Sequence, residues 1–449
     1  MRADLSTLFD RLFPICRSIT GPGLRESLAI FAEHMPLQMH GVPTGEKVLD
    51  WTVPREWSVT AARLIGPDGA VVCDVADHNL HLVNYSIPFA GKMPLAELQP
   101  HLHSLPHLPD AIPYVTSYYS DRWGFCLPHR QREALPDGMY TVDIQTDLTE
   151  GEVTFATADL PGDSDEIVLI SSYLCHPSMA NNELSGPLAL VRIYERLRDL
   201  PRRHVTYRFL LCPETIGSIA YLARFGDEIA PKLKGGMVLT CLGGHRNTLS
   251  FKLSRRDWVG RPCAMDDLAR HFAGAYPDQV ELRPFTPISG SDERQFCSPG
   301  YDFPVIQAAR TVYGQYAEYH SSADDKRLMR IEQVEHAADR LAEVLEAFDY
   351  TDLMLCNRHP FGEPQLGRRG LYPTINSPMN RGSSADGKSD SRQTLNRLLM
   401  ILSLADGTRD LCDMAEKIGC GVDALLPIVK ALIAQDMLAL DPKGGAAHG

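Results

Sequence analysis

The sequence has no hydrophobic run that could cross a membrane and no excess of positive charge. No apolar segment approaches the ~20 residues that a membrane span needs. Charged side chains interrupt the apolar positions of residues 1–20, which is not the pattern of a secretory signal. The chain has 44 Lys and Arg against 57 Asp and Glu, and the net charge of −13 disfavours binding to nucleic acid or to an anionic membrane. We therefore expect a cytoplasmic protein without a nucleic-acid or membrane partner.

The sequence also lacks paired cysteines. Its 11 cysteines are an odd number and include no Cys-x-x-Cys pair. Cys126, Cys175, Cys212 and Cys241 lie in apolar or strand-like contexts, where reduced cysteine acts as a small core residue. This usage is typical of a reducing compartment and supports the cytoplasmic expectation.

Apolar runs alternate with helical patterns from about residue 165 to residue 350. The first expected strand is 167–171, and the first expected helix is 187–200. Because alternating strands and helices build a mainly parallel sheet with both faces covered, we predict an α/β fold. The other elements expected here are the strands 206–212, 237–242 and 304–308, and the helices 216–225, 265–275 and 331–348.

The rest of the chain differs in texture from this region. A chain of 449 residues is long enough for two or three domains. Residues 4–35 show helical periodicity, and short apolar runs alternate with Pro, Gly and Asp turns from 45 to 160. The predicted domains are an α/β domain at 1–44 and 160–350, an inserted β-rich domain at 45–159, a linker at 351–390 and a C-terminal domain at 391–449.

The C-terminal segment has the pattern of a winged helix. Three helical patterns, at 395–404, 410–418 and 422–433, precede a short strand-like run at 437–440. Residues 391–449 hold six Lys and Arg and seven Asp and Glu, whereas a DNA-binding domain is normally basic. A packing or dimerisation role is therefore favoured over DNA binding, and a homo-oligomer is compatible with the sequence.

Four segments with chemically active side chains follow apolar sequence in the α/β region. A hydrolytic zinc site needs three nitrogen or oxygen ligands, an open position for water and a carboxylate to take a proton. His176, Glu183 and His320 can supply the ligands, and Glu214 can supply the base. Each signal is weak alone, since Glu214 could equally be a first-turn charge that complements a helix dipole. The segments are 175–186, 213–218, 289–293 and 318–324.

The order of these motifs resembles the zinc aminopeptidase and glutaminyl cyclase superfamily. The similar motifs are His-Pro-Ser-x-Ala-Asn from His176, Glu-x-Ile-Gly from Glu214, Ser-Asp-x-x-x-Phe from Ser291 and Tyr-His-Ser-Ser-x-Asp from Tyr319. More narrowly, nearly the whole chain is similar to an uncharacterised bacterial aminopeptidase-like family, to which the segments 14–21, 50–57 and 123–126 also conform. The resemblance implies a phosphorylase/hydrolase-like zinc-peptidase fold with an inserted β domain and a C-terminal winged-helix-like domain.

The chain departs from that family at three metal positions. The resemblance places Asn182 where an Asp bridges two zinc ions, Thr215 where a Glu is a ligand, and Thr240 where an Asp is a ligand. Neutral Asn and Thr are poor zinc ligands, and two adjacent dications without bridging carboxylates repel each other. We therefore predict one zinc ion per chain, held by His176 and two partners, Glu183 and His320.

Further residues have two interpretations each. Asp292 is either a substrate contact or proton relay, or a turn-capping residue. Asp324 either orients His320 by a hydrogen bond without binding the metal itself, or is an exposed charge at a helix start. Asn182 is likewise expected to support the site without binding the metal. Arg310 and Tyr313 follow an expected strand and are candidate substrate-binding residues, with Arg310 suited to a carboxylate. The aromatic residues Tyr118, Tyr119 and Trp123 either line a pocket or, as is favoured, pack in the core.

These observations predict a metallopeptidase-like zinc hydrolase that acts on an amide or peptide bond of a small substrate, with Glu214 as general base. Two alternatives remain open at this stage. One is a zinc-dependent acyltransferase or cyclase on the same fold, and the other is a binding module that has lost catalysis. The substrate and leaving group are not fixed by the sequence.

Overall fold

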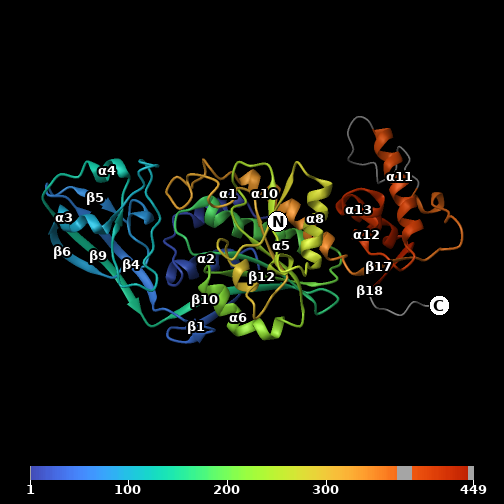
Figure 1. Cartoon of the computed structure of the whole chain (residues 1–449), viewed down its shortest axis with the longest axis horizontal. Coiled ribbons are helices and arrows are strands. Elements are labelled where there is room, and N and C mark those ends of the chain that lie inside the picture. The colour runs from blue at the N-terminus through green and yellow to red at the C-terminus, as the bar shows by residue number, and fades with distance from the viewer. Residues whose placement is uncertain (1, 372–386, 443–449) are drawn as a thin grey trace. The chain divides into compact units, whose positions relative to one another are not determined.

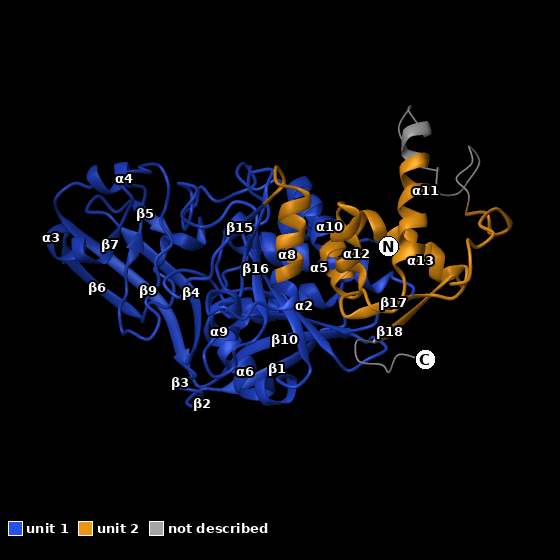
Figure 2. Cartoon of the chain, turned by 45° about the vertical axis from the view of Figure 1, so that its right-hand side comes forward, with its two compact units in different colours: residues 1–266, 281–341 blue, residues 267–280, 342–449 orange. Residues whose placement is uncertain are grey.

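The computed structural model describes residues 2–371 and 387–442, which form two compact units (Figures 1 and 2). Unit 1 comprises residues 1–266 and 281–341, and unit 2 comprises residues 267–280 and 342–449. Part of the predicted linker at 351–390, namely residues 372–386, lies outside the described residues. None of the described helices is both long enough and apolar enough to cross a membrane.

An eight-stranded sheet forms the centre of unit 1. Its order is β1-β10-β12-β11-β13-β16-β14-β15. The adjacent strands β12, β11, β13 and β16 run parallel, while β1, β10 and β14 pair antiparallel toward the edges. The predicted mainly parallel α/β fold is confirmed. The bounds are β1 Gln38–Pro43, β10 Glu152–Leu160, β11 Ile167–Tyr173, β12 Thr206–Cys212, β13 Leu233–Leu239, β14 Leu249–Lys252, β15 Val280–Arg283 and β16 Val305–Ala309.

The central strand β11 explains how the sequence positions the functional loop. All seven of its residues are buried, as expected for a parallel strand covered on both faces. Helix α5 (Ser185–Arg198) packs against β11, β12 and β13, and helix α6 (Ile216–Ile229) packs against β10. The loops that leave β11 and β12 therefore emerge together at the carboxyl edge of the sheet. Helices α1 (Leu5–Leu12) and α2 (Pro22–Ala32) also belong to unit 1, and α8 (Ala264–Ala275) and α10 (Ile331–Phe348) have residues in both units.

A second, antiparallel sheet lies within the predicted inserted domain. Its order is β5-β4-β9-β6. Strand β10, which the sequence interpretation assigned to this insertion, pairs instead with β1 and β12 of the main sheet. The sequence of β10 resembles that of the strands just before it in the chain. Its sheet is therefore revealed only by the strands with which it pairs. The bounds are β4 Glu56–Ile65, β5 Val71–Asp74, β6 Phe89–Pro94 and β9 Met139–Thr149, with the short strands β2 Lys47–Val48 and β3 Trp51–Thr52 nearby in sequence.

Unit 2 contains the winged helix. Strands β17 (Leu353–Asn357) and β18 (Leu438–Pro442) pair antiparallel. Between them in sequence are the helices α11 (Gly387–Leu404), α12 (Leu411–Ile418) and α13 (Val422–Ala434). Strand β17 lies in the stretch that the sequence suggested was linker. Helix α12 begins with a capping box from Asp410 and ends at Gly419 in the left-handed conformation, which are standard start and stop signals.

Candidate metal centre

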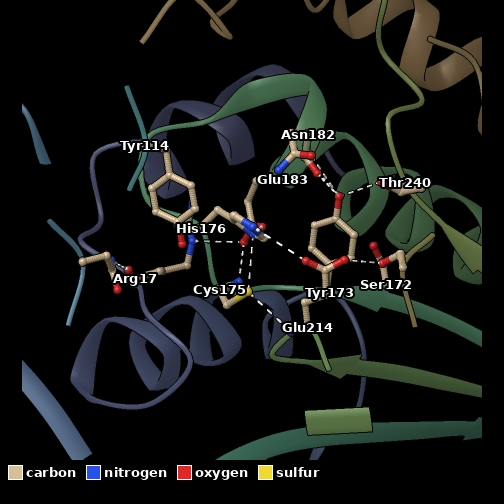
Figure 3. Close-up of polar contacts among 12 residues, drawn as sticks. Arg17, Tyr114, Ser172, Tyr173, Cys175, His176, Asn182, Glu183, Glu214 and Thr240 are labelled. Carbon is tan, nitrogen blue, oxygen red and sulfur yellow. Dashed lines mark hydrogen bonds and ion pairs between the residues drawn. The ribbon is translucent and has the colours of Figure 1, made fainter. Parts of the chain in front are cut away.

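His176 lies on a buried loop just after β11, and a carboxylate holds one of its ring nitrogens. Its Nδ1 is 2.8 Å from Oε2 of Glu183, which lies in a π-helical turn, Ala180–Leu184 (Figure 3). The backbone N–H of Cys175 donates to the other Glu183 oxygen at 2.6 Å. Glu183 therefore fixes both the ring and the backbone of the loop, and the opposite nitrogen, Nε2, faces away from Glu183.

A buried arginine from the N-terminal region stands behind Glu183. The Arg17 Nε lies 3.6 Å from Glu183 Oε1, and both side chains have no exposed surface. Arg17 also donates to the carbonyl of Leu12 at 2.6 Å and to the Ser27 hydroxyl at 3.3 Å. The sequence analysis did not single out Arg17, although it lies in a segment, 14–21, that conforms to the aminopeptidase-like family.

Glu214 faces the other nitrogen of His176. It follows β12 by two residues, and its Oε2 is 3.8 Å from His176 Nε2. Its Oε1 accepts a hydrogen bond of 2.6 Å from the Ser291 hydroxyl. Burial raises the pKa of Glu214 above the ordinary carboxyl range, while His176 and Ser291 oppose that rise. The next residue, Thr215, has a φ of 64°, an unfavourable backbone conformation of the kind that clusters at functional sites.

Asp292 supports the Glu214 loop from beneath. Its carboxylate accepts hydrogen bonds from the Thr215 backbone N–H at 2.7 Å and the Ser218 hydroxyl at 2.8 Å. Burial, followed by the charge of Glu214, raises the pKa of Asp292 to about 7. Asp292 is fully buried, and its side chain makes no cap hydrogen bond at its own helix, α9 (Glu293–Phe296), so it holds the Thr215 turn instead. Its role as a proton relay stays a prediction.

A buried ion pair fixes the loop that carries Ser291. The Lys252 ammonium lies 2.8 Å from Glu293 Oε1, and the other Glu293 oxygen accepts from the Ser291 backbone N–H at 2.9 Å. Lys252 also donates to the carbonyl oxygens of Thr286 and Ser289 at 3.1 and 2.6 Å. The Ser291 hydroxyl is therefore aimed at Glu214 by a charged pair that no sequence spacing indicated.

His320 completes the group from a distant part of the chain. Its ring centre lies 5.4 Å from that of His176, and its carbonyl accepts a hydrogen bond of 2.8 Å from the Tyr114 N–H. Burial, with a smaller contribution from His176, lowers the pKa of His320 to about 3. Among the described residues, the buried His320 Nε2 has no hydrogen-bond partner. A neutral imidazole with an unpartnered nitrogen is a suitable metal ligand.

Asp324 has a different contact from the one predicted. Its carboxylate accepts hydrogen bonds from the backbone N–H groups of Asn181 at 2.6 Å and Asn182 at 2.9 Å. It is fully buried, so it is not an exposed helix-start charge, and it holds the π-helical turn of Glu183 in place of orienting His320. Asp324 takes this position because the buried backbone N–H groups of that turn need an acceptor.

Neutral groups hydrogen-bond to one another around Asn182 and Thr240. The Tyr173 hydroxyl contacts the Asn182 backbone carbonyl and lies 2.6 Å from the Thr240 hydroxyl. The Asn182 side-chain nitrogen is buried and has no partner among the described residues. The Tyr173 hydroxyl, the Asn182 amide and the Thr240 hydroxyl therefore lie together on this side of the site (Figure 3).

A pocket of about 320 Å³ opens onto these groups. Tyr118 and Tyr119 contribute to its wall, whereas Trp123 is buried and stacks on His101 with ring centres 3.8 Å apart. Arg310 and Tyr313 do not line the pocket, and Arg310 instead donates to the Arg246 carbonyl at 2.8 Å. The lining residues are Ile19, Trp51, Tyr114, Thr116, Tyr118, Tyr119, Cys175, His176, Glu214, Thr215, Ile216 and His320.

Three side chains are close enough together to hold a metal ion. Ligand atoms of Cys175, His176 and Glu183 all lie within 4.8 Å of one another. His320 is not one of these three, so the predicted shared coordination by His176, Glu183 and His320 stays a prediction. All the cysteines of the chain, Cys175 included, are free thiols.

Comparison with known proteins relates the whole chain to one family. Residues 6–351 match a domain of unknown function, DUF4910, and residues 354–440 match a winged helix-turn-helix domain. A protein of Clostridium acetobutylicum is 36% identical over 437 residues, covering 97% of this chain and 96% of its own length. It is provisionally named a polysaccharide biosynthesis protein with an aminopeptidase-like domain.

Solved structures support the same relationship. A crystal structure from Clostridium acetobutylicum, provisionally described as a peptidase, has a TM-score of 0.85 at 34% identity, covering 98% of this chain and 96% of that one. A zinc aminopeptidase from Bacillus subtilis shares the fold, with a TM-score of 0.56 at 13% identity over 76% of this chain and 92% of that one. The chain therefore belongs to the DUF4910 family and is an aminopeptidase-like protein with a C-terminal winged helix.

Proposed function

We propose that the chain is a zinc-dependent hydrolase that cleaves an amide or peptide bond in a small substrate, with Glu214 as general base. The observation that carries the proposal is the position of Glu214, whose Oε2 lies 3.8 Å from His176 Nε2 on the pocket surface. A base must be within reach of the proton that it removes, and this carboxylate faces the same space as the two histidines.

The residues present are suited to one zinc ion. His176 Nε2 and the unpartnered His320 Nε2 would supply two nitrogen ligands, and both residues line the pocket. Zinc in a histidine and carboxylate site acidifies water and polarises a carbonyl group. One ion is favoured over two because Asn182 and Thr240 are neutral and already bond through the Tyr173 hydroxyl.

Glu183 can act in this scheme either as a metal ligand or as a residue that positions His176. The sequence predicts a ligand, and its proximity to Cys175 and His176 is compatible with that role. We favour a positioning role, because Glu183 Oε2 lies 2.8 Å from His176 Nδ1 and so leaves Nε2 for the metal. In that role the ion needs a third protein ligand besides the two histidines. Such carboxylate partners fix the tautomer and orientation of a ligand histidine.

The chain's own groups can then carry out proton transfer. Glu214 would take a proton from water and return it to the leaving amine. The Ser291 hydroxyl holds Glu214 in place at 2.6 Å, and Asp292 fixes the adjacent Thr215 amide. The raised pKa of Glu214, caused by burial, suits a group that must both accept and release a proton near neutral pH.

Metal analysis of purified protein tests this proposal. We expect about one zinc per wild-type chain, and loss of zinc in the single variants His176→Ala and His320→Ala. Glu183→Gln should still reach one zinc per chain but bind it roughly 10–100-fold more weakly. Loss of a carboxylate that orients a ligand histidine typically has an effect of this size. If wild-type protein saturated with zinc and then dialysed held none, the proposal would be wrong. Loss of zinc from Glu183→Gln at saturation would show instead that Glu183 is a ligand.

The winged helix is expected not to bind DNA. In helix-turn-helix proteins the N-terminal end of the recognition helix contacts base edges. Here the first residues of α13 contact residues 267–280 of the same unit. The Val422 N–H donates to His271 Nε2 at 3.0 Å, and the Tyr276 hydroxyl donates to the Asp423 carboxylate at 2.7 Å. An acidic residue at this end also repels phosphate.

Fluorescence anisotropy with a labelled random-sequence duplex measures this directly. We expect a Kd weaker than about 10⁻⁴ M at physiological salt, the weak limit of non-specific DNA binding. Micromolar binding that weakens steeply with added salt would contradict the expectation and assign the winged helix to DNA.

A further inference from the structure

One wall of the pocket is aromatic, and its Tyr114 lies against both histidines, with ring centres 5.1 Å from His176 and 5.2 Å from His320. Trp51 and Tyr119 meet edge to face, with ring centres 5.4 Å apart, and are 38% and 53% exposed. Tyr119 keeps a φ of 60°, a conformation that a bulky residue adopts only when its surroundings enforce it. Deeper in the wall, the hydroxyls of Tyr114 and Tyr118 bond to each other at 2.8 Å. The wall therefore offers flat, uncharged faces to a ligand.

The same pocket has few charged lining residues. Its twelve lining residues include no Lys or Arg, and Glu214 is the only carboxylate among them. Glu214 already accepts a hydrogen bond from the Ser291 hydroxyl and faces His176. The buried Arg17 lies against Glu183 and has no exposed surface, so it is not available to a ligand.

This charge pattern restricts the substrate on both sides of its amide bond. A free α-carboxylate would need a cation other than the proposed zinc ion, which faces the bond that is cleaved, and a free α-ammonium group would need a carboxylate other than the base Glu214. An unpaired charge removed from water costs several kcal/mol. Glu214 is the one carboxylate among the lining residues, so the described part of the chain places no second carboxylate there for an ammonium group. The volume of about 320 Å³ is near the lower end for small-molecule sites, so a charged group in it would lie close to these walls.

We propose that the substrate is a neutral N-acylated amide with an apolar or flat group beside the bond that is cleaved, and that free-amine peptides are disfavoured. This inference rests on the proposed hydrolase function and narrows it from aminopeptidase-like to amidase or deacylase specificity. The aromatic wall binds the flat group. Away from the base Glu214 and the proposed zinc ion, the lining residues offer no charged partner to a carboxylate or an ammonium group of the substrate.

Three p-nitroanilides that differ only in charge test the proposal on the zinc-loaded full chain. They are leucine p-nitroanilide, which is cationic, N-acetyl-leucine p-nitroanilide, which is neutral, and N-succinyl-leucine p-nitroanilide, which is anionic. We expect kcat/KM for the neutral compound to exceed both others by at least about tenfold. Preference for the free amine would overturn the inference while leaving the hydrolase proposal intact.

If none of the three is cleaved, the hydrolase proposal loses support, and binding then tests the inference separately. The probes are leucinamide and N-acetyl-leucinamide, followed by quenching of tryptophan fluorescence, with Trp51→Phe to identify the pocket signal. Tighter binding of the acetylated amide, by about tenfold or more, supports the inference. Equal or weaker binding overturns it.

A matched pair of variants isolates the effect of charge. Thr116 lines the pocket but has no place in the proposed machinery. Thr116→Glu adds a carboxylate, and Thr116→Gln adds nearly the same shape without charge. We expect Thr116→Glu to raise the ratio of free-amine to acetylated cleavage, or of free-amine to acetylated binding, by about tenfold, with Thr116→Gln leaving the ratio unchanged. An equal change in both variants would overturn the inference.

Discussion

Replacing Glu214 with Gln is expected to lower kcat by about 10²–10⁴-fold while zinc binding stays intact, because the amide cannot accept a proton from water. The hydrogen bond from the Ser291 hydroxyl, 2.6 Å long in the wild type, can form equally with the Gln carbonyl oxygen, so the loop should keep its place. The measurement is kcat on the best substrate of the p-nitroanilide series, together with zinc content and the thermal unfolding temperature.

Ser291→Ala is the matched control for this effect. It removes the hydroxyl that positions Glu214 and leaves the base itself present, so kcat should fall by less than in Glu214→Gln. A Glu214→Gln variant that retained wild-type kcat with full zinc content would show that another group acts as the base. Loss of zinc in that variant would instead place Glu214 among the ligands.

Glu293→Ala is expected to destabilise unit 1 by about 3–5 kcal/mol, because it leaves the Lys252 ammonium buried without its counter-charge. Lys252 and Glu293 are both essentially unexposed and lie 2.8 Å apart. The Ser291 backbone N–H also loses its acceptor, so kcat should fall together with stability. Urea unfolding, followed by a signal from unit 1, measures the change in the free energy of unfolding.

The double variant Lys252→Met with Glu293→Gln provides the control for charge. It removes both charges and keeps a carbonyl oxygen near Ser291, so most of the lost stability should return. If Glu293→Ala unfolds at the wild-type urea concentration, the pair contributes little and the Ser291 loop is held by other contacts. If the double variant is as unstable as Glu293→Ala, packing and not the unpaired charge is responsible.

The residues that follow strands could be placed from the sequence. His176 and Glu214 come directly after apolar runs, and parallel strands end at a common edge, so their convergence was predictable. The Leu174 N–H bonds to the Cys212 carbonyl at 2.8 Å, which continues the alignment of the two strands into their loops. Helix and strand texture likewise predicted the α/β sheet and the winged helix.

The partners of these residues could not be placed in the same way. Arg17 and Glu183 are 166 positions apart in sequence, and nothing in the spacing of either indicates the other. Trp51 lies on a two-residue strand that periodicity cannot detect, yet it lines the pocket. Arg310 shows the opposite error, because a position after a strand was taken as an approach to the site, whereas its guanidinium turns toward Arg246 and His336.

The bond between the Tyr114 N–H and the His320 carbonyl has a consequence for the order in which the molecule is made. Ribosomes add about 5–20 residues per second, so on the order of 15–60 s separates the synthesis of Arg17 from that of His320. Until His320 emerges, the pocket lacks one of its lining residues and the histidine pair is incomplete. A nascent chain therefore has no complete pocket for most of its synthesis, and both histidines are present only after the last strand of the main sheet has been made.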